Sequence, residues 1–464
     1  MSTVGGAATA RAPKSPETRE QKSWYWYDWA NSAYVTTTAT VLFAPYLTSV
    51  ATAAACPDLV DGQRCAATLS VLGIPVSPGS LVAYTATVST IISAIFLIFV
   101  GAIADRSPHP TKLFATFAWT GALAATLMCL VTGTNWQLGV LLFVIANICL
   151  GSSLVIYDSL LVRIAGPNDR DRVSSKGWAF GYLGGGLLLL VNFVLVAKPS
   201  LLGLDRGGAV RVSLLMAGIW WAAFTIIPVR GLRHVTGTVA PPIAPGEGVV
   251  GGSLRQLRET FRDLAMHYPQ TKLFLLAYLF FNDGIQTVIG NSSLYGIEEL
   301  EFPQETVLGI FLFVQFVAFF GARFFGQVAA RIGAWKTVLG SLGIWTLIVT
   351  VAFFVPAKSL VLFLALAFFI GMVLGGSQAL SRSLYSQLIP AGKEAEYFSL
   401  YQAMERGTSW FGTLIFGLVY QATLSYRAAI LALIVFFLLG GVLLSRVKMR
   451  EGIIQAGNEV PRVI

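Results

Sequence analysis

The sequence predicts an all-α integral membrane protein with twelve transmembrane helices in two six-helix, pseudo-symmetric bundles. Only 12% of the 464 residues are charged, about half the share found in soluble domains, and the mean hydropathy is +0.70. Apolar runs of roughly 18 residues or more, long enough to cross a bilayer, recur along the whole chain. Two short polar motifs of the first half also reappear at corresponding places in the second half.

Twelve apolar segments have the length of a membrane span. They are expected at about residues 24–50, 80–104, 112–133, 137–163, 175–198, 209–229, 270–295, 304–330, 334–355, 359–388, 395–421 and 425–446. A stretch rich in proline and glycine separates the first six spans from the last six. The predicted organisation is an N-terminal tail (1–23), a first bundle (24–229), a linker (230–269), a second bundle (270–446) and a C-terminal tail (447–464).

Lysine and arginine are distributed unevenly between the predicted loops. Most of the 32 basic residues fall in the two tails, the linker and the short loops on the same side. Because basic loops stay in the cytoplasm, we predict that both termini are cytoplasmic, in a multi-pass protein of the cell (plasma) membrane. The polar residues 1–23 do not predict a cleavable signal peptide. The net charge of +9 belongs to these loops and does not indicate nucleic-acid binding.

The linker contains a segment with helical spacing of apolar residues. Ser253 precedes the apolar set, and three arginines alternate with it (Leu254, Leu257, Phe261 and Leu264; Arg255, Arg258 and Arg262). This pattern predicts an amphipathic helix capped by Ser253. Two placements remain open, the cytoplasmic membrane surface and a solvated linker helix.

The long loop predicted at about residues 51–79 contains Cys56 and Cys65. On the oxidising side of a membrane, two loop cysteines this close can pair. We predict a disulfide, with two free thiols as the alternative.

Two polar motifs suggest an internal duplication. After the second span the chain reads Gly-Ala-Ile-Ala-Asp-Arg from Gly101, and after the eighth it reads Gly-Gln-Val-Ala-Ala-Arg from Gly326. Likewise Asp28-x-x-Asn-Ser in the first span matches Asp283-x-x-Gln-Thr in the seventh. Parallel repeats of six spans with a substrate site between them are typical of one large class of transporters.

The segment GAIADRSPHPTK resembles the loop motif of the major facilitator superfamily. The segments YDWANSAY, RVSSKGWAFGYLGGGLLLL, AYLFFNDGIQTVI and GSQALSRSLYSQLIPAGKEAEYFSLY more narrowly resemble the branch that contains the vacuolar amino-acid effluxers linked to autophagy and their bacterial relatives. The resemblance covers about residues 24–450 and implies twelve helices and solute export or release. It also implies that Asp105 and Arg106 hold span 2 against the end of span 11. Asp158 departs from the branch, which has a neutral residue there.

The spans expected to line a cavity between the halves each carry a polar stripe. Amides, hydroxyls and counter-charges in such stripes can recognise a zwitterion, or can form ion pairs that lock the helices. Predicted substrate contacts are Asn31, Tyr34, Asn282, Asp283, Gln286, Gln378, Arg382, Tyr385 and Gln402. Predicted proton-coupling or gate residues are Asp28, Asp158, Asp283, Glu405 and Arg406. The predicted conformational loop motif is Gly101, Asp105, Arg106, Lys112, Gly326 and Arg331. Arg323 is expected to pair with one of the acids.

We therefore predict a secondary transporter that moves amino acids or similar small polar solutes by alternating access, with export as the direction and protons as a candidate coupling ion. An exporter of drugs, sugars or organic anions is the alternative, followed by a membrane sensor that does not transport. An enzyme is not expected, because the three histidines all fall in cytoplasmic segments and form no catalytic pair. We expect a monomer in a lipid bilayer that binds a small solute and needs no cofactor or metal.

Overall fold

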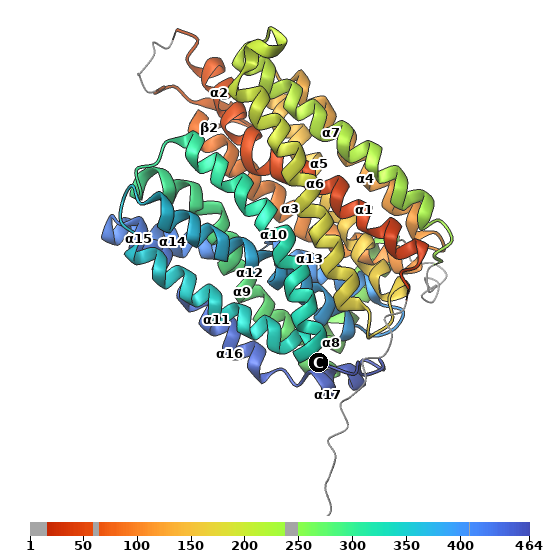
Figure 1. The fold of residues 1–464 in the computed structure, drawn as a ribbon. Coiled ribbons are helices and arrows are strands. Elements are labelled where there is room, and N and C mark those ends of the chain that lie inside the picture. The colour runs from red at the N-terminus through yellow and green to blue at the C-terminus, as the bar shows by residue number, and fades with distance from the viewer. Residues whose placement is uncertain (1–15, 59–64, 237–248, 408) are drawn as a thin grey trace, which may run out of the picture.

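Two helical bundles lie side by side in the computed structural model (Figure 1). The structure describes residues 16–58, 65–236, 249–407 and 409–464. Each bundle has its own large apolar core, one built around Trp24 and Trp221 and the other around Trp345 and Phe437. Apart from Ala395, the buried residues of the first core lie within 24–232 and those of the second within 264–453. The predicted domain boundaries stay a prediction.

The first bundle contains the helices of the six predicted N-terminal spans and a short hairpin. Its elements are α1 (Arg19–Ala33), the π-helical η1 (Tyr34–Leu42), α2 (Phe43–Ala55), β1 (Leu69–Val71), β2 (Ile74–Val76), α3 (Pro78–Arg106), α4 (Pro110–Leu127), the 3-10 turn η2 (Met128–Leu130), α5 (Trp136–Ile164), α6 (Arg170–Ala197), the 3-10 turn η3 (Pro199–Leu202) and α7 (Arg206–Gly231).

The linker helix and the second bundle follow. Their elements are α8 (Val249–Met266), α9 (Pro269–Leu294), the π-helical η4 (Tyr295–Glu299), α10 (Gln304–Ile332), α11 (Ala334–Phe354), α12 (Leu360–Gln387), α13 (Glu394–Gly407), α14 (Ser409–Thr423), α15 (Tyr426–Ala432), α16 (Ile434–Arg446) and α17 (Met449–Gln455).

Among the described residues, eleven helical segments are long and apolar enough to cross a membrane. The eleventh predicted span, 395–421, corresponds to α13 and α14, on either side of residue 408, which lies outside the described residues. With α13 and α14 counted together as one further span, the arrangement is that of a twelve-span bundle.

The first span is longer than predicted and changes its helix type midway. It runs from Arg19 to Ala55, and residues Tyr34–Leu42 are π-helical. This segment is rich in β-branched residues, which crowd the preceding turn of an α-helix. Pro45 follows and cannot donate a backbone hydrogen bond. Both features weaken regular α-helix where the chain passes the space between the bundles.

The duplicated glycine motif has the same packing role in each half. A β-carbon added to Gly101 of α3 would lie 2.7 Å from the Ala395 carbonyl of α13, in the other half. One added to Gly326 of α10 would lie 2.7 Å from Ser175 Oγ of α6, again across the halves. Each glycine therefore permits close contact between one bundle and the opposite one, as expected of a parallel repeat.

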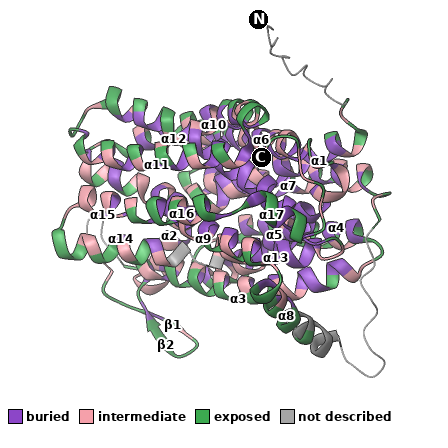
Figure 2. Ribbon diagram, turned by 90° about the horizontal axis from the view of Figure 1, so that it is seen from below, coloured by how far each residue is buried: buried purple, intermediate pink, exposed green. Residues whose placement is uncertain are grey.

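The predicted linker helix is present as α8, at the edge of the bundles beside α3 (Figure 2). It already runs from Val249, so Ser253 lies inside it and the prediction that Ser253 caps it is wrong. Leu264 is buried, whereas Phe261 is 46% exposed. The side chains of Leu254 and Leu257 lie outside the described residues. Contact of the exposed face with lipid stays a prediction.

Both described ends of the chain bind the same loop. Near the N-terminus, Glu17 accepts a hydrogen bond of 2.9 Å from Arg172, just after the α5–α6 loop. Near the C-terminus, the backbone amide of Arg462 donates to Asn168 Oδ1 at 2.8 Å in that loop. The two termini therefore lie at the same end of the bundles, as an even number of spans requires.

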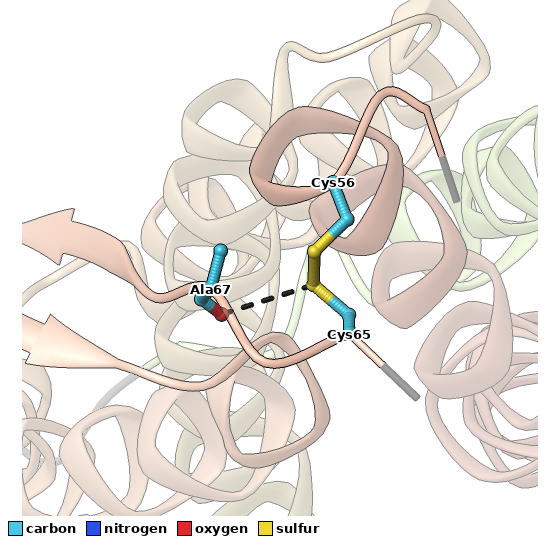
Figure 3. Close-up of a disulfide and its surroundings, with 3 residues drawn as sticks. All are labelled: Cys56, Cys65 and Ala67. Atoms are coloured by element: carbon cyan, nitrogen blue, oxygen red, sulfur yellow. Dashed lines mark hydrogen bonds between the residues drawn. A yellow bond between two sulfur atoms is a disulfide. The ribbon is translucent and has the colours of Figure 1, made fainter. Parts of the chain in front are cut away.

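The long loop at the opposite end contains the predicted disulfide. Cys56 and Cys65 are joined, with their Cα atoms 5.9 Å apart (Figure 3). The hairpin that follows was not predicted; its antiparallel strands pair Leu69 with Val76. The turn places Leu72 and Gly73 at positive φ, the backbone of a tight hairpin turn.

Candidate functional site

A buried arginine joins the two bundles. Arg382 of α12 has a side chain only 3% exposed and donates from Nη2 to Asp28 Oδ2 of α1 at 3.1 Å. Its Nη1 donates to Asp158 Oδ1 of α5, also at 3.1 Å. One guanidinium from the second half thus forms ion pairs with two carboxylates of the first half.

Further polar groups complete this cluster. Tyr157 donates to Asp28 Oδ2 at 2.8 Å, and Gln402 of α13 donates to Asp158 Oδ2 at 2.9 Å. The Arg382 guanidinium also lies 4.7 Å from the Trp24 ring centroid. Buried charges are tolerated when they are paired and hydrogen-bonded in this way, so the cluster holds four helices together.

A second layer of contacts closes the same end. Arg170, at the start of α6, donates to the Ser386 carbonyl of α12 at 2.8 Å. Gln387 Nε2 of α12 donates a hydrogen bond of 2.9 Å to the Pro167 carbonyl. The Ser383 hydroxyl donates to the Asp171 carboxylate. The end of the molecule that carries the termini is therefore closed by direct contacts between the halves.

The loop motif contributes a third contact across the halves. The Asp105 carboxylate of α3 accepts hydrogen bonds from the backbone amides of Ala395 at 2.9 Å and Glu396 at 2.8 Å. These amides are at the start of α13, where a helix has unpaired donors and a positive dipole end. Asp105 thus caps α13, which fits the predicted contact between spans 2 and 11. Ala330 stands at the corresponding place in α10 and cannot form such a cap.

Two adjoining cavities lie between the halves. They are on the side of the Arg382 cluster that faces away from the termini. One has a volume of about 240 Å³ and the other about 280 Å³. Both are lined by Val35 of η1, Gln286 of α9 and Glu405 of α13. Gln378 of α12 lines the first cavity and Arg406 the second. The shared space thus contains one acidic, one basic and several amide side chains.

The predicted site residues divide into two groups. Those that line the cavities are Gln286, Gln378, Glu405 and Arg406. Those whose side chains instead pair with other protein groups outside these linings are Asp28, Asn31, Tyr34, Asp158, Asn282, Asp283, Arg382, Tyr385 and Gln402.

Tyr34 and Arg323 illustrate how far the placement differs from the expectation. Tyr34 stacks on Trp221 of α7 with centroids 5.2 Å apart, inside the first bundle. Arg323 is exposed on α10 and lies 5.7 Å from the Phe319 ring centroid. The expectation that Arg323 pairs with one of the intramembrane acids is wrong, because those acids face the interior.

Many of the lining residues were not predicted, and three of them have side chains that can contact a polar solute. They are Trp178 and Tyr182 of α6 and Gln315 of α10. The sequence predicts polar stripes on spans 1, 4, 7, 10 and 11. Helices α6 and α10, which are outside this set, pack against each other at the boundary between the halves. The glycines of α6 were the available signal, since they mark close helix packing there.

Comparisons with known proteins agree with this architecture. A family model described as "Vacuole effluxer Atg22 like" matches residues 17–457. The uncharacterized MFS-type transporter YxiO of Bacillus subtilis (strain 168) is 28% identical over 448 residues, covering 96% of this chain and 99% of YxiO. Autophagy-related protein 22-2 of Emericella nidulans is 25% identical over 482 residues, covering 83% and 80%.

Solved structures share the fold at low sequence identity. A bacterial homologue of the iron transporter ferroportin, in an outward-facing state, aligns with a TM-score of 0.65 and 15% identity over 92% of this chain and 98% of its own. The human organic anion transporter MFSD10 (TETRAN) aligns with a TM-score of 0.66 and 14% identity over 93% and 100%. These matches confirm the predicted major facilitator fold.

Proposed function

The chain belongs to the family of Atg22-like vacuole effluxers and is a membrane transporter of the major facilitator type, and from this premise we propose that it exports amino acids or similar small polar solutes. The proposal includes transport by alternating access, without a cofactor, by a monomer in the plasma membrane with both termini in the cytoplasm. A solute gradient or protons would supply the driving force.

One observation carries the choice of solute. Glu405 and Arg406 have opposite charges, are adjacent in α13 and line the space between the halves. The amides of Gln286 and Gln378 line the same space. A zwitterion carries an ammonium that a carboxylate can accept and a carboxylate that a guanidinium can bind. In this proposal Glu405 faces the amino group of the solute and Arg406 its carboxylate.

The Arg382 cluster supports a gate on the side of the cavities that faces the termini. Asp28, Asp158 and Arg382 belong to both halves and lie between the cavities and the end that carries the termini. Opening that end would separate Arg382 from both acids. We therefore assign these residues to the gate. With the termini in the cytoplasm, the structure corresponds to a state closed toward the cytoplasm.

The test is solute flux in proteoliposomes that contain the purified full chain. The panel contains neutral amino acids, amines that lack the carboxylate, carboxylic acids that lack the amine, sugars and organic anions, each with and without a pH gradient. We expect amino acids to be transported. Glu405→Gln should reduce flux of amino acids at least about tenfold, because one charged hydrogen bond contributes about 1.5–3 kcal/mol.

Matched variants separate the roles of the two charges. Arg406→Gln should reduce amino-acid flux more than amine flux, because amines lack the carboxylate. Glu405→Gln should reduce amino-acid flux more than carboxylic-acid flux, because carboxylic acids lack the amine. Arg323→Gln, which removes an exposed arginine of α10, should leave flux unchanged. Absence of flux for every amino acid would refute the proposed substrate class, and flux of sugars or organic anions alone would favour those alternatives. Unchanged pH coupling in Asp28→Asn would exclude that residue as the proton carrier.

A further inference from the structure

A further cavity lies between α4 and α7, at the end of the first bundle that carries the termini. The two helices pack side by side (Figure 1). The hydroxyl of Thr111, at the start of α4, donates to the Leu232 carbonyl, just after α7, at 3.0 Å. The cavity beside this bond has a volume of about 350 Å³, which is in the range of about 300–1,000 Å³ typical of small-molecule sites. The proposed transport path between the halves does not include it.

Three basic side chains line this cavity. They are His109 and Lys112 from the start of α4 and Arg233 from the segment after α7. Within the described part of the chain, none of the three forms an ion pair and no acid lines the cavity. Arg233 Nε donates to His234 Nε2 at 2.8 Å, a bond that does not involve the two Nη groups of the guanidinium. Glu20 of α1 interacts electrostatically with His234 but is not part of the lining. The cavity therefore favours an anion.

Away from the loop, the lining of the same cavity is apolar. Ala115 and Trp119 of α4 and Val229 of α7 form this part. The Trp119 side chain is 40% exposed, and its indole N–H donates to the Ala222 carbonyl of α7 at 3.1 Å. A tryptophan with one polar contact and an exposed apolar ring is typical of the headgroup level of a membrane. The cavity thus lies where the polar and apolar parts of a lipid meet.

Exposed side chains on both helices continue from this cavity toward the middle of the spans. They recur at intervals of three or four residues, which places each set on one helix face. The set on α4 is Lys112, Thr116, Trp119, Leu123 and Leu127. The set on α7 is Arg230, Ile226, Ala223 and Ile219. Each face has its basic residue at the end that carries the termini and apolar residues beyond it. A molecule with an anionic head and an apolar tail matches both faces.

We propose that the cavity between α4 and α7 binds the headgroup of an anionic phospholipid, with an acyl chain along the exposed apolar residues of both helices. Lys112 offers the phosphate a point charge, and Arg233 offers it a planar fork of N–H donors. Basic pockets between transmembrane helices bind the headgroups of anionic lipids in this way. A soluble anion would leave the apolar faces without a partner, so the distribution favours a lipid.

The second half differs at the matching corner. A cavity of about 680 Å³ lies there between the start of α11 and the end of α16. Its lining includes Glu451, which pairs with Lys448 at 3.4 Å. This corner therefore contains a counter-charge from the protein itself, and the proposal is restricted to the first half.

Native mass spectrometry of the purified full chain in detergent tests the site. The protein is titrated with phosphatidylglycerol, whose headgroup has one negative charge, and with zwitterionic phosphatidylcholine that has the same acyl chains. We expect phosphatidylglycerol to bind at least about tenfold more tightly, because each Lys or Arg near a membrane surface contributes about fivefold in affinity for anionic lipid. Phosphatidylglycerol should also raise Tm in a saturable way, as a ligand of the folded state does. Inorganic phosphate should do neither.

Variants of the two exposed cations locate the site. Lys112→Gln and Arg233→Gln should each weaken binding of phosphatidylglycerol about fivefold, and the double variant at least about tenfold. Lys112→Arg keeps the charge and should bind as the wild type does. Lys272→Gln is the matched control, because Lys272 is exposed at the start of α9 and does not line the cavity. An unchanged Tm without lipid shows that each variant is folded.

Three results would overturn the proposal. Equal affinity for the two lipids would show that charge has no part in binding. Wild-type affinity in the double variant, or an equal loss in Lys272→Gln, would place the lipid elsewhere. Displacement of phosphatidylglycerol by inorganic phosphate at equal concentration would make the cavity a site for soluble anions. Because these measurements need no transported solute, failure of the proposed amino-acid transport would not decide them.

Discussion

Arg382 and Asp158 lie 3.1 Å apart across the boundary between the two bundles, with side chains 3% and 1% exposed. They are 224 residues apart in sequence and belong to different halves. Such a contact can exist only while the halves are closed at this end. Separation of the pair would therefore report on opening of the gate that we propose.

Replacing Arg382 should open the end that carries the termini. Arg382→Ala leaves two buried carboxylates without a partner, and breaking a buried pair in this way costs about 3–5 kcal/mol. Arg382→Lys keeps the charge but lacks the planar fork that reaches both acids, so its effect should be smaller. The readout is the rate of maleimide labelling of Ser386→Cys, a buried position of α12, in a background without other free cysteines.

We expect Arg382→Ala to accelerate this labelling by at least about tenfold, since about 1.4 kcal/mol corresponds to a tenfold change in an equilibrium. Arg323→Ala is the control, because it removes an exposed arginine of a neighbouring helix. An unchanged labelling rate in Arg382→Ala would mean that the cluster does not hold the gate closed.

Removal of the Asp105 carboxylate should loosen the start of α13. Loss of a helix cap costs about 0.5–2 kcal/mol, and loss of a negative charge at a helix N-terminus adds about 0.3–1 kcal/mol. Asp105→Ala should therefore speed hydrogen exchange at the amides of Ala395 and Glu396 several-fold to about tenfold, and Asp105→Asn should do so less. Arg331→Ala, in the second copy of the motif, should not change it. If Asp105→Ala leaves hydrogen exchange at the start of α13 unchanged, Asp105 does not cap this helix.

Hydropathy and motif repetition predicted the fold because both are local signals in the chain. The depth and direction of single side chains are not local. Asn31 and Tyr34 share an α-helical face with Asp28, yet π-helix begins at Tyr34. A wider turn changes the phase of the following residues. Val35, Thr36 and Thr40 of this segment line the cavity, whereas Tyr34, its first residue, packs against Trp221.

The role of Arg382 shows a second limit of the sequence. An arginine in a membrane span fits a substrate contact and an ion pair equally well. Asp28, its partner, is 354 residues away, and only the packing of α1, α5 and α12 decides that both acids reach it. Gln286 and Gln378 line the space between the halves, and their contact with solute stays a prediction.

The disulfide should stabilise the long loop between the first two spans. Cys56 and Cys65 close a loop of sequence separation 9, and a loop of this size gains about 2–3 kcal/mol in the chain-entropy model. Maleimide should label neither cysteine without reductant and both after reduction. Cys56→Ser with Cys65→Ser should increase protease cleavage within this loop, while Cys149→Ser, a buried cysteine of α5, serves as the control. Full labelling without reductant would exclude the disulfide.

The linker helix α8 should depend on an ion pair with the loop before α13. Lys393 donates to Asp263 Oδ2 at 2.9 Å, and this hydrogen bond lowers the pKa of Asp263. Thr260, one turn earlier in α8, donates to Glu396. Lys393→Gln removes the charge and should increase hydrogen exchange in the last turns of α8 about two- to fivefold, because partly exposed pairs contribute only about 0.2–1 kcal/mol.

The pH dependence of this contact follows from the direction of the shift. A carboxyl whose pKa is lower in the folded state than in the unfolded state stabilises the folded state at pH above its unfolded pKa, about 3.9. This stabilisation is lost as the pH falls through the pKa of the folded state. Protection of α8, corrected for intrinsic exchange, should therefore be constant between about pH 5 and 8 and fall only in stronger acid. Lys448→Gln, at the residue before α17, should leave α8 unchanged. If protection of α8 fell between pH 8 and 5 in the wild type, a group other than Asp263 would hold α8 in place. In that case Lys393→Gln should show the same hydrogen exchange as the wild type.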